Sequence, residues 1–294
     1  MERKGYSLNQ SYAEKKELIA LLIRKKPDYA EILRFYGKIF ALYATASPRL
    51  NLKLPIVEKP IMDIREMEGF PLISREEFLI DVPSSTALFE AICTASKHAN
   101  EKMRINIQIL EEAFSVNALR LEDLLKHHED NTYLDLVLRD FAIDKAVLKF
   151  LIHMSIYPSL HAHAEMLKDQ INLKQWLRGY CPICGSRPLM SEFNAEGLRE
   201  YLCSFCGFEW PGERLKCPFC ENSDHTKLHY FYAEGDEAYR VDICDACNQY
   251  IKTVDSRKLD YEPDLGLEDI VTIHLDILAS EKGFKRPVAS PWGI

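Results

Sequence analysis

The segment from Cys181 to Cys247 holds four Cys-x-x-Cys pairs: Cys181-Pro-Ile-Cys184, Cys203-Ser-Phe-Cys206, Cys217-Pro-Phe-Cys220 and Cys244-Asp-Ala-Cys247. The pairs are separated by 18, 10 and 23 residues, and the ninth cysteine, Cys93, lies far from them. Two intervening residues let one turn direct both sulfurs at one ion, as in tetrahedral thiolate sites. Redox-active dithiols or free thiols are the alternative, but thioredoxin-type motifs occur singly beside a βαβ pattern. The spacing therefore predicts metal sites.

The four pairs form two similar halves. Cys181-Pro-Ile-Cys184 matches Cys217-Pro-Phe-Cys220 at an offset of 36 residues, and Tyr201-Leu-Cys203 matches Asp242-Ile-Cys244 at an offset of 41. A duplicated unit that owns two pairs can enclose its own ion. The alternative is an interleaved arrangement of the pairs. The repeat predicts one site from Cys181, Cys184, Cys203 and Cys206, and another from Cys217, Cys220, Cys244 and Cys247.

The residue that follows the second cysteine of each pair differs between the halves. Gly185 and Gly207, in the first half, tolerate the positive φ often needed at this place. Glu221 and Asn248 take it in the second half, and only asparagine suits a left-handed conformation well. We therefore expect the first site to be the more regular. Each half has only about 35 residues, so a bound ion should supply folding free energy directly.

The rest of the chain has helical patterns. Apolar residues recur at helical spacing in several segments up to about Gln175. Pro158 should kink or end the last of these helices. One final helix is expected after a charged linker, and Gly283 lies where its left-handed C-cap would be. The apolar spacing of this final helix is set by Leu267, Ile270, Val271, His274 and Leu278.

The charge of the chain disfavours nucleic-acid binding. Lys and Arg number 37 against 45 Asp and Glu, which gives a formal charge of -8. Residues 178–255 alone hold eight basic and thirteen acidic residues. A nucleic-acid-binding ribbon should instead be basic. We therefore expect a protein partner.

Other function classes find no support in the sequence. No apolar run approaches the ~18 residues that span a bilayer, and the start of the chain is polar, so we expect a cytoplasmic protein without membrane insertion. No nucleotide-binding, zincin or hydrolase motif occurs. The histidines and Cys93 fit structural or solvent-facing positions, Cys93 as a small buried apolar residue. We predict neither an enzyme nor a small-molecule substrate.

Longer stretches around the pairs carry further signals. They are Trp176-Leu-Arg-Gly-Tyr-Cys-Pro-Ile-Cys-Gly-Ser-Arg-Pro188, Tyr201-Leu-Cys-Ser-Phe-Cys-Gly-Phe-Glu-Trp210, Arg214 with Cys217-Pro-Phe-Cys220, Cys244-Asp-Ala-Cys-Asn-Gln-Tyr-Ile-Lys252 and Glu268-Asp-Ile-Val-Thr-Ile-His-Leu-Asp276. These stretches resemble the FdhE family of formate dehydrogenase accessory proteins. The clear resemblance spans about Trp176 to Gly283. Glu221 departs from it, because a glycine is more usual there.

The resemblance implies a fold and a function. The fold is α+β, with a mainly α-helical N-terminal domain at 1–175, a first rubredoxin-like (zinc-ribbon-like) four-cysteine module at 176–214, a second at 215–255, and a linker with a C-terminal helix at 256–294. The function is that of an accessory, chaperone-like maturation protein that binds the catalytic subunit of formate dehydrogenase. The ligand role falls on the eight paired cysteines, with iron or zinc as the ion.

Two other functions stay open at this stage. A rubredoxin-like electron-transfer or redox-sensing protein would use the same cysteines, since four thiolates accept either zinc or iron and the spacing does not choose between them. A nucleic-acid-binding ribbon protein is the third hypothesis, which the acidic window disfavours.

Overall fold

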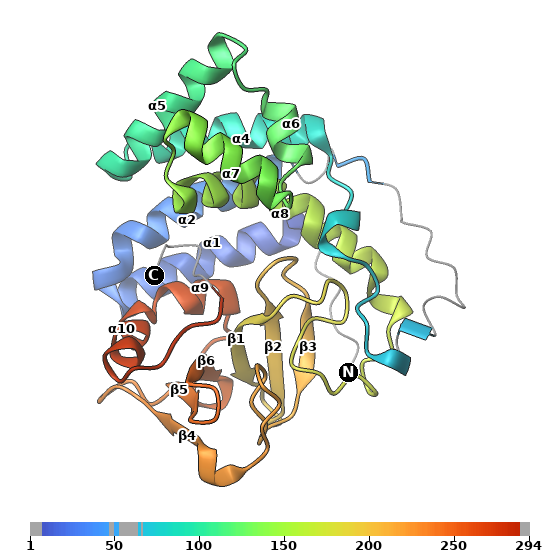
Figure 1. The fold of residues 1–294 in the computed structure, drawn as a ribbon. Coiled ribbons are helices and arrows are strands. Elements are labelled where there is room, and N and C mark those ends of the chain that lie inside the picture. Colours follow the sequence, from blue (N-terminus) through green and yellow to red (C-terminus); the bar gives the residue numbers. More distant parts are fainter. Residues whose placement is uncertain (1–7, 47–49, 53–63, 66, 289–294) are drawn as a thin grey trace. The chain divides into compact units, whose positions relative to one another are not determined.

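The computed structural model of the chain describes residues 8–46, 50–52, 64–65 and 67–288 (Figure 1). These residues fall into two units. The first contains the described residues of 1–53 together with Phe78–His163, and the second contains those of 54–77 and of 164–294. Within the described residues, no helix combines the length and the apolar character needed to cross a membrane.

The first unit is helical. Two of its helices, Val82–Ser96 and Glu101–Ser115, begin at side chains that accept a hydrogen bond from the first turn: Asp81 from the Ser84 amide, and Asn100 from the Met103 amide, both at 2.9 Å. Leu33, Tyr36 and Ile39 of one helix are buried in its core. The helices are α1 (Leu8–Lys25), α2 (Ala30–Ala46), α4 (Val82–Ser96), α5 (Glu101–Ser115), α6 (Leu121–Lys126), α7 (Asn131–Phe141) and most of α8 (Lys145–Leu167), with a 3₁₀ turn at Pro27–Tyr29.

The sequence predicts that Pro158 kinks or ends its helix. Helix α8 continues through Pro158 to Leu167, so the proline does not end it. Proline lacks an N–H group, which leaves the carbonyl oxygen four residues earlier without its helical donor. That oxygen belongs to Met154, and the Tyr43 hydroxyl donates to it at 2.7 Å. A side chain from α2 thus replaces the missing backbone bond.

The second unit is built on one six-stranded sheet with the order β3-β2-β1-β6-β5-β4. The first half of the cysteine-rich segment supplies an antiparallel set of three strands, and the second half supplies another. The two sets meet at a parallel pair, where Ser191 of β1 faces Thr253 of β6. The strands are β1 (Pro188–Phe193), β2 (Arg199–Cys203), β3 (Glu209–Gly212), β4 (Leu228–Phe231), β5 (Tyr239–Cys244) and β6 (Gln249–Asp255). The chain is therefore a mixed α+β protein whose two cysteine-rich halves share one sheet.

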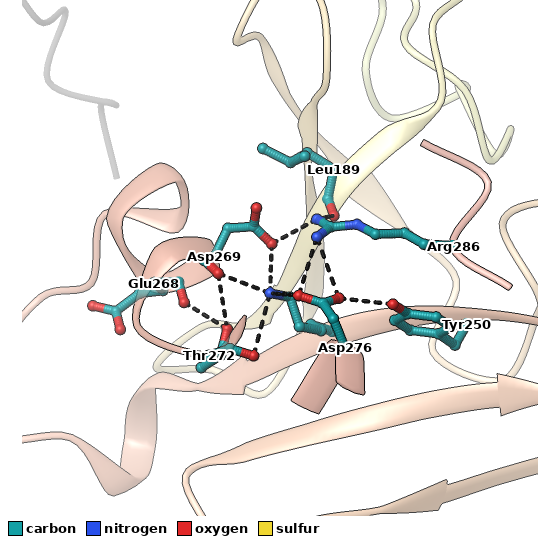
Figure 2. Close-up of polar contacts among 8 residues, drawn as sticks. Leu189, Tyr250, Glu268, Asp269, Thr272, Asp276 and Arg286 are labelled. Atoms are coloured by element: carbon teal, nitrogen blue, oxygen red, sulfur yellow. Dashed lines mark hydrogen bonds and ion pairs between the residues drawn. The ribbon is translucent and has the colours of Figure 1, made fainter. Parts of the chain in front are cut away.

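The C-terminal part forms two helices, α9 (Leu265–Ile270) and α10 (Ile273–Glu281), where the sequence predicts one. At the break, two side chains donate to backbone carbonyl oxygens of α9, one of them from outside the segment. Lys252 of β6 donates to the carbonyl oxygen of Asp269 at 2.8 Å, and the Thr272 hydroxyl donates to that of Glu268 at 2.6 Å (Figure 2). In a continuous helix these oxygens would accept from the backbone four residues on. The expected left-handed C-cap is present, since Gly283 has a φ of 86°.

Helices α9 and α10 pack on the sheet through an apolar core. Met190 of β1, Val241 of β5 and Val254 of β6 are fully buried there. Leu265 of α9 and Leu275 of α10 pack in the same cluster. The C-terminal helices are therefore part of the unit that carries the paired cysteines.

Candidate metal centres

The first four-cysteine cluster combines two turns. Cys181 and Cys184 precede β1, while Cys203 ends β2 and Cys206 follows it. The Sγ atoms lie within 4.8 Å of one another, with Cys181 to Cys206 at 3.8 Å and Cys184 to Cys203 at 3.4 Å. All four residues are buried. Amides of the second turn point at its sulfur, because the N–H groups of Phe205 and Cys206 donate to Cys203 Sγ at 3.4 and 3.5 Å.

The second cluster has the same arrangement. Cys217 Sγ lies 3.8 Å from Cys247 Sγ, and Cys220 Sγ lies 3.7 Å from Cys244 Sγ. Here Cys220 is exposed and Cys247 is half-buried. Among the residues that the structure describes, these are the two groups of side chains close enough to share an ion. The grouping of the eight cysteines agrees with the sequential pairing expected from the repeat.

The backbone of all four turns is alike. Gly185 and Gly207 both have a φ of 71°, and Glu221 and Asn248 have φ values of 57° and 55°. In three of the turns the amide of this residue donates to the carbonyl oxygen of the first cysteine, for example Glu221 to Cys217 at 3.0 Å. Glu221 therefore adopts the left-handed conformation that a side chain with a Cβ disfavours. The irregularity expected at the second site is not in the turn geometry, and the difference between the sites is exposure.

The sulfur separations fit a tetrahedral thiolate ion. Metal–sulfur bonds of about 2.3 Å place the sulfurs of a tetrahedron about 3.8 Å apart. Three of the four separations given above are 3.7 or 3.8 Å, and the Cys184–Cys203 separation is shorter at 3.4 Å. None of the nine cysteines is joined in a disulfide. The geometry thus gives two clusters that could each hold an ion of the zinc or iron type.

Burial makes several of the thiols poor acids. It raises the pKa of Cys181 and Cys206 well above the ordinary value for cysteine, and raises that of Cys247 to about 11. Burial also acts on Cys184, but hydrogen bonds within the cluster outweigh it and hold the pKa of that thiol well below its ordinary value. A thiol with a raised pKa stays protonated at neutral pH, whereas a bound cation draws off the proton. Cys93 also has a pKa raised to about 12 by burial, but it stands outside both clusters.

The histidines near the second cluster take no place in it. His229 Nε2 lies 3.2 Å from a carboxylate oxygen of Asp245 and belongs to neither cluster. His225 lies in a 3₁₀ turn at His225–Lys227, also outside the cluster. Both agree with the structural or solvent-facing positions expected of them.

A segment far away in the sequence covers the first cluster. Leu72 and Ile73 donate their amides to the carbonyl oxygens of Pro182 and Ile183 at 2.9 and 3.0 Å, within the first Cys-x-x-Cys turn. Arg75 lies over the ring of Phe205 at 4.5 Å from its centroid. Sequence reasoning missed this cover, because the segment lies within 1–175 and carries no motif that points to the cysteines.

Comparison with known proteins relates the chain to a known family. The family model for the FdhE central domain matches residues 180–214, and that for the FdhE C-terminal domain matches residues 215–292. The protein FdhE homolog of Aquifex aeolicus (strain VF5) is 27% identical over 271 residues, which cover 90% of this chain and 89% of the relative. The chain belongs to the FdhE family. Its first four-cysteine cluster lies within the part that matches the FdhE central domain, and its second lies within the part that matches the C-terminal domain.

Two further comparisons agree with the family. Protein FdhE of Escherichia coli (strain K12) is 34% identical over 119 residues, which cover 39% of this chain and 38% of that protein. The crystal structure of the FdhE protein from Pseudomonas aeruginosa matches with a TM-score of 0.68 and 21% identity, and covers 97% of this chain and 96% of that one. The latter likeness shows the same fold along nearly the whole chain.

Proposed function

We propose that this protein is an accessory, chaperone-like maturation factor that binds the catalytic subunit of formate dehydrogenase. The observation that carries the proposal is a pair of preformed four-sulfur clusters in a chain of the FdhE family. The family resemblance points to the enzyme as the partner, and the clusters supply a reason for metal dependence. In this proposal the protein has no catalytic role of its own and acts in the cytoplasm.

The eight paired cysteines are the proposed ligands, four for each ion. Their thiolates would hold iron or zinc, both of which accept four sulfur ligands. The ion would displace the protons that burial keeps on thiols such as Cys181 and Cys206, and it would neutralise part of the charge on the resulting thiolates. Amides such as those of Phe205 and Cys206 would stabilise the thiolates and orient them.

The test of the partner is co-purification under anaerobic conditions. We expect the tagged wild-type chain, and a Cys93→Ser control whose altered thiol lies outside both clusters, to retain the catalytic subunit. A Cys220→Ser/Cys247→Ser variant should retain less of it. Failure of the wild-type chain to retain the catalytic subunit would overturn the proposal.

A second function is favoured by one observation. Cys220 is exposed, so an ion at the second cluster would lie near the solvent, as an electron-transfer or redox-sensing centre requires. Anaerobic purification followed by elemental analysis and an absorption spectrum separates the two functions. Iron with thiolate-to-iron absorption that bleaches on reduction supports the redox function, and a colourless zinc protein excludes it.

A further inference from the structure

The C-terminal segment Phe284–Val288 lies beside the last Cys-x-x-Cys turn. The Lys285 amide donates to the carbonyl oxygen of Asn248 at 2.9 Å, and the Tyr250 amide donates to the carbonyl oxygen of Lys285 at 3.2 Å. Gln249 and Lys285 thereby form a parallel bridge. Asn248 is the left-handed residue directly after Cys247, so the segment contacts the turn at the place that shapes it.

Arg286 anchors this segment in the protein interior. Its side chain is only 8% exposed and donates to Asp269 Oδ1 at 2.6 Å and to both carboxylate oxygens of Asp276, at 3.2 and 3.3 Å (Figure 2). It also donates to the carbonyl oxygen of Leu189 in β1 at 3.2 Å. One arginine therefore joins the C-terminal segment to α9, α10 and the sheet.

The same carboxylates bind the strand that leaves the turn. Lys252 Nζ lies 2.8 Å from Asp269 Oδ1 and 2.7 Å from Asp276 Oδ2, and the Tyr250 hydroxyl donates to Asp276 Oδ1 at 2.8 Å. The side chains of Lys252, Asp269 and Asp276 are no more than 1% exposed. Two cations and two carboxylates thus balance one another in the interior, and a buried charge that loses its partner is costly. The network holds β6 and the C-terminal segment in a fixed relation.

We propose that Phe284–Val288 is a positioning element of the second metal site. The segment holds the Cys244–Asn248 turn in the shape that binds an ion, through the Lys285 backbone and the Arg286 anchor. Docking of the segment and ion binding at the second cluster are therefore coupled. By thermodynamic linkage, the factor by which docking raises the affinity for the ion is also the factor by which the ion favours docking.

The first cluster provides an internal control. Its first turn is bonded to Leu72 and Ile73, and the hydrogen bonds of Lys285 and Arg286 described above do not involve its cysteines. A change in the C-terminal segment should alter the second site and leave the first unchanged. This inference rests on the proposed metal-binding function, because it concerns the affinity of one of the two proposed sites.

The decisive variant is Lys285→Pro in the full chain, compared with Lys285→Ala. Proline removes the amide that donates to Asn248, while alanine keeps it, and the Lys285 side chain is exposed in the native protein. The probe is Zn²⁺, titrated against a competing chelator, and alkylation of the released thiols identifies the site that has lost its ion. We expect Lys285→Pro to lower the affinity for one of the two Zn²⁺ ions by about 5- to 150-fold. Cys220 and Cys247 should then become reactive toward the alkylating reagent. Lys285→Ala should match the wild type.

The outcomes separate this inference from the proposed function. A wild-type chain that binds no ion would overturn the metal-binding function itself. A wild-type chain that binds two ions, with equal second-site affinity in Lys285→Pro and Lys285→Ala, would overturn only the positioning role.

A measurement on the wild type covers the case in which Lys285→Pro does not fold. Removal of the second ion by chelator should speed hydrogen exchange at the Tyr250 and Lys285 amides, while the Leu72 and Ile73 amides keep their protection. Unchanged exchange at Tyr250 and Lys285 would overturn the coupling.

Discussion

The two four-cysteine clusters have the same turns and sulfur separations but different covers. In the first, Cys181 and Cys206 are completely buried, and the Leu72–Ile73 segment is bonded over the first turn. In the second, Cys220 is exposed and the supporting contacts come from the C-terminal segment behind Asn248. Local sequence thus sets the ligand geometry, whereas distant segments set access to it. For the proposed metal-binding function, this comparison predicts a structural role for the first site and exchange with solvent or a partner at the second.

The largest expected effect separates the sites by their contribution to folding. Cys184→Ser should lower the free energy of unfolding of the metal-loaded protein by more than about 4 kcal/mol, because a structural ion at a buried site supplies folding free energy. Cys220→Ser should lower it by about 2 kcal/mol, since water can approach the vacant ligand position. Urea unfolding under anaerobic conditions measures both. Equal losses would remove the distinction between the sites.

The buried charges behind the second site should make its support sensitive to acid. Burial raises the pKa of Asp269, but Arg286 and Lys252 outweigh burial and hold the pKa below its ordinary value. A lowered carboxyl pKa gives stability that is present above the unfolded value of about 3.9 and is lost as the pH falls through the folded value. Asp269→Asn should therefore cost about 3–5 kcal/mol at pH 7 and progressively less below about pH 4.

The matched control for this prediction is Asp255→Asn. Asp255 pairs at 2.8 Å with Arg257, whose side chain is 42% exposed, so its loss should cost less than about 1 kcal/mol. Thermal unfolding as a function of pH measures both variants. A cost of Asp269→Asn that stays constant down to pH 3 would contradict the argument.

Metal exchange tests the difference in cover directly. With a chelator in excess, we expect one ion per chain to leave at least about tenfold faster than the other. If local opening of the buried first site costs about 1.4 kcal/mol more free energy than opening of the second, its ion is released about tenfold more slowly. Alkylation during the first phase should label Cys220 and Cys247 and spare Cys181 and Cys184. A single exponential release of both ions would show that the covers do not control exchange.

The smallest expected effect concerns the left-handed residues, where the two sites should respond in opposite directions. Glu221→Gly should raise the free energy of unfolding by about 1 kcal/mol, because its φ of 57° is strained for a residue with a Cβ. Gly185→Ala should lower it by about 1–2 kcal/mol, since it adds that strain and places a Cβ 3.1 Å from Pro71. Urea denaturation of the two single variants provides the measurement. The same sign for both would show that φ does not decide the effect.

The candidate sites were predictable from sequence because their signal is local and repeated. The spacing within each pair predicts a turn, and the offset of 36 residues predicts which pairs belong together. The fold class followed from helical spacing up to about Gln175 and from the family resemblance. None of these inferences needed a contact between distant segments.

The segments that cover the sites and the irregularities of the helices were not predictable, because they depend on contacts between residues far apart in the sequence. The break between α9 and α10 depends on Lys252, and the continuity of α8 depends on Tyr43, each more than ten residues away from the helix that it affects. Leu72 and Ile73 reach the first turn through backbone amides, which leave no pattern in the side chains. Exposure of Cys220 is likewise decided by what packs nearby and not by the pair that contains it.

The parallel pairing of β1 with β6 joins the two repeats at strand edges that each would otherwise expose. As a separate polypeptide, the first repeat would present β1 as a bare edge, and the second would present β6. Unpaired edges invite indiscriminate strand addition and aggregation. Fusion hides both of these edges and leaves β3, which carries Pro211, and the four-residue β4 at the rims. The duplication therefore removes one exposed strand edge from each repeat.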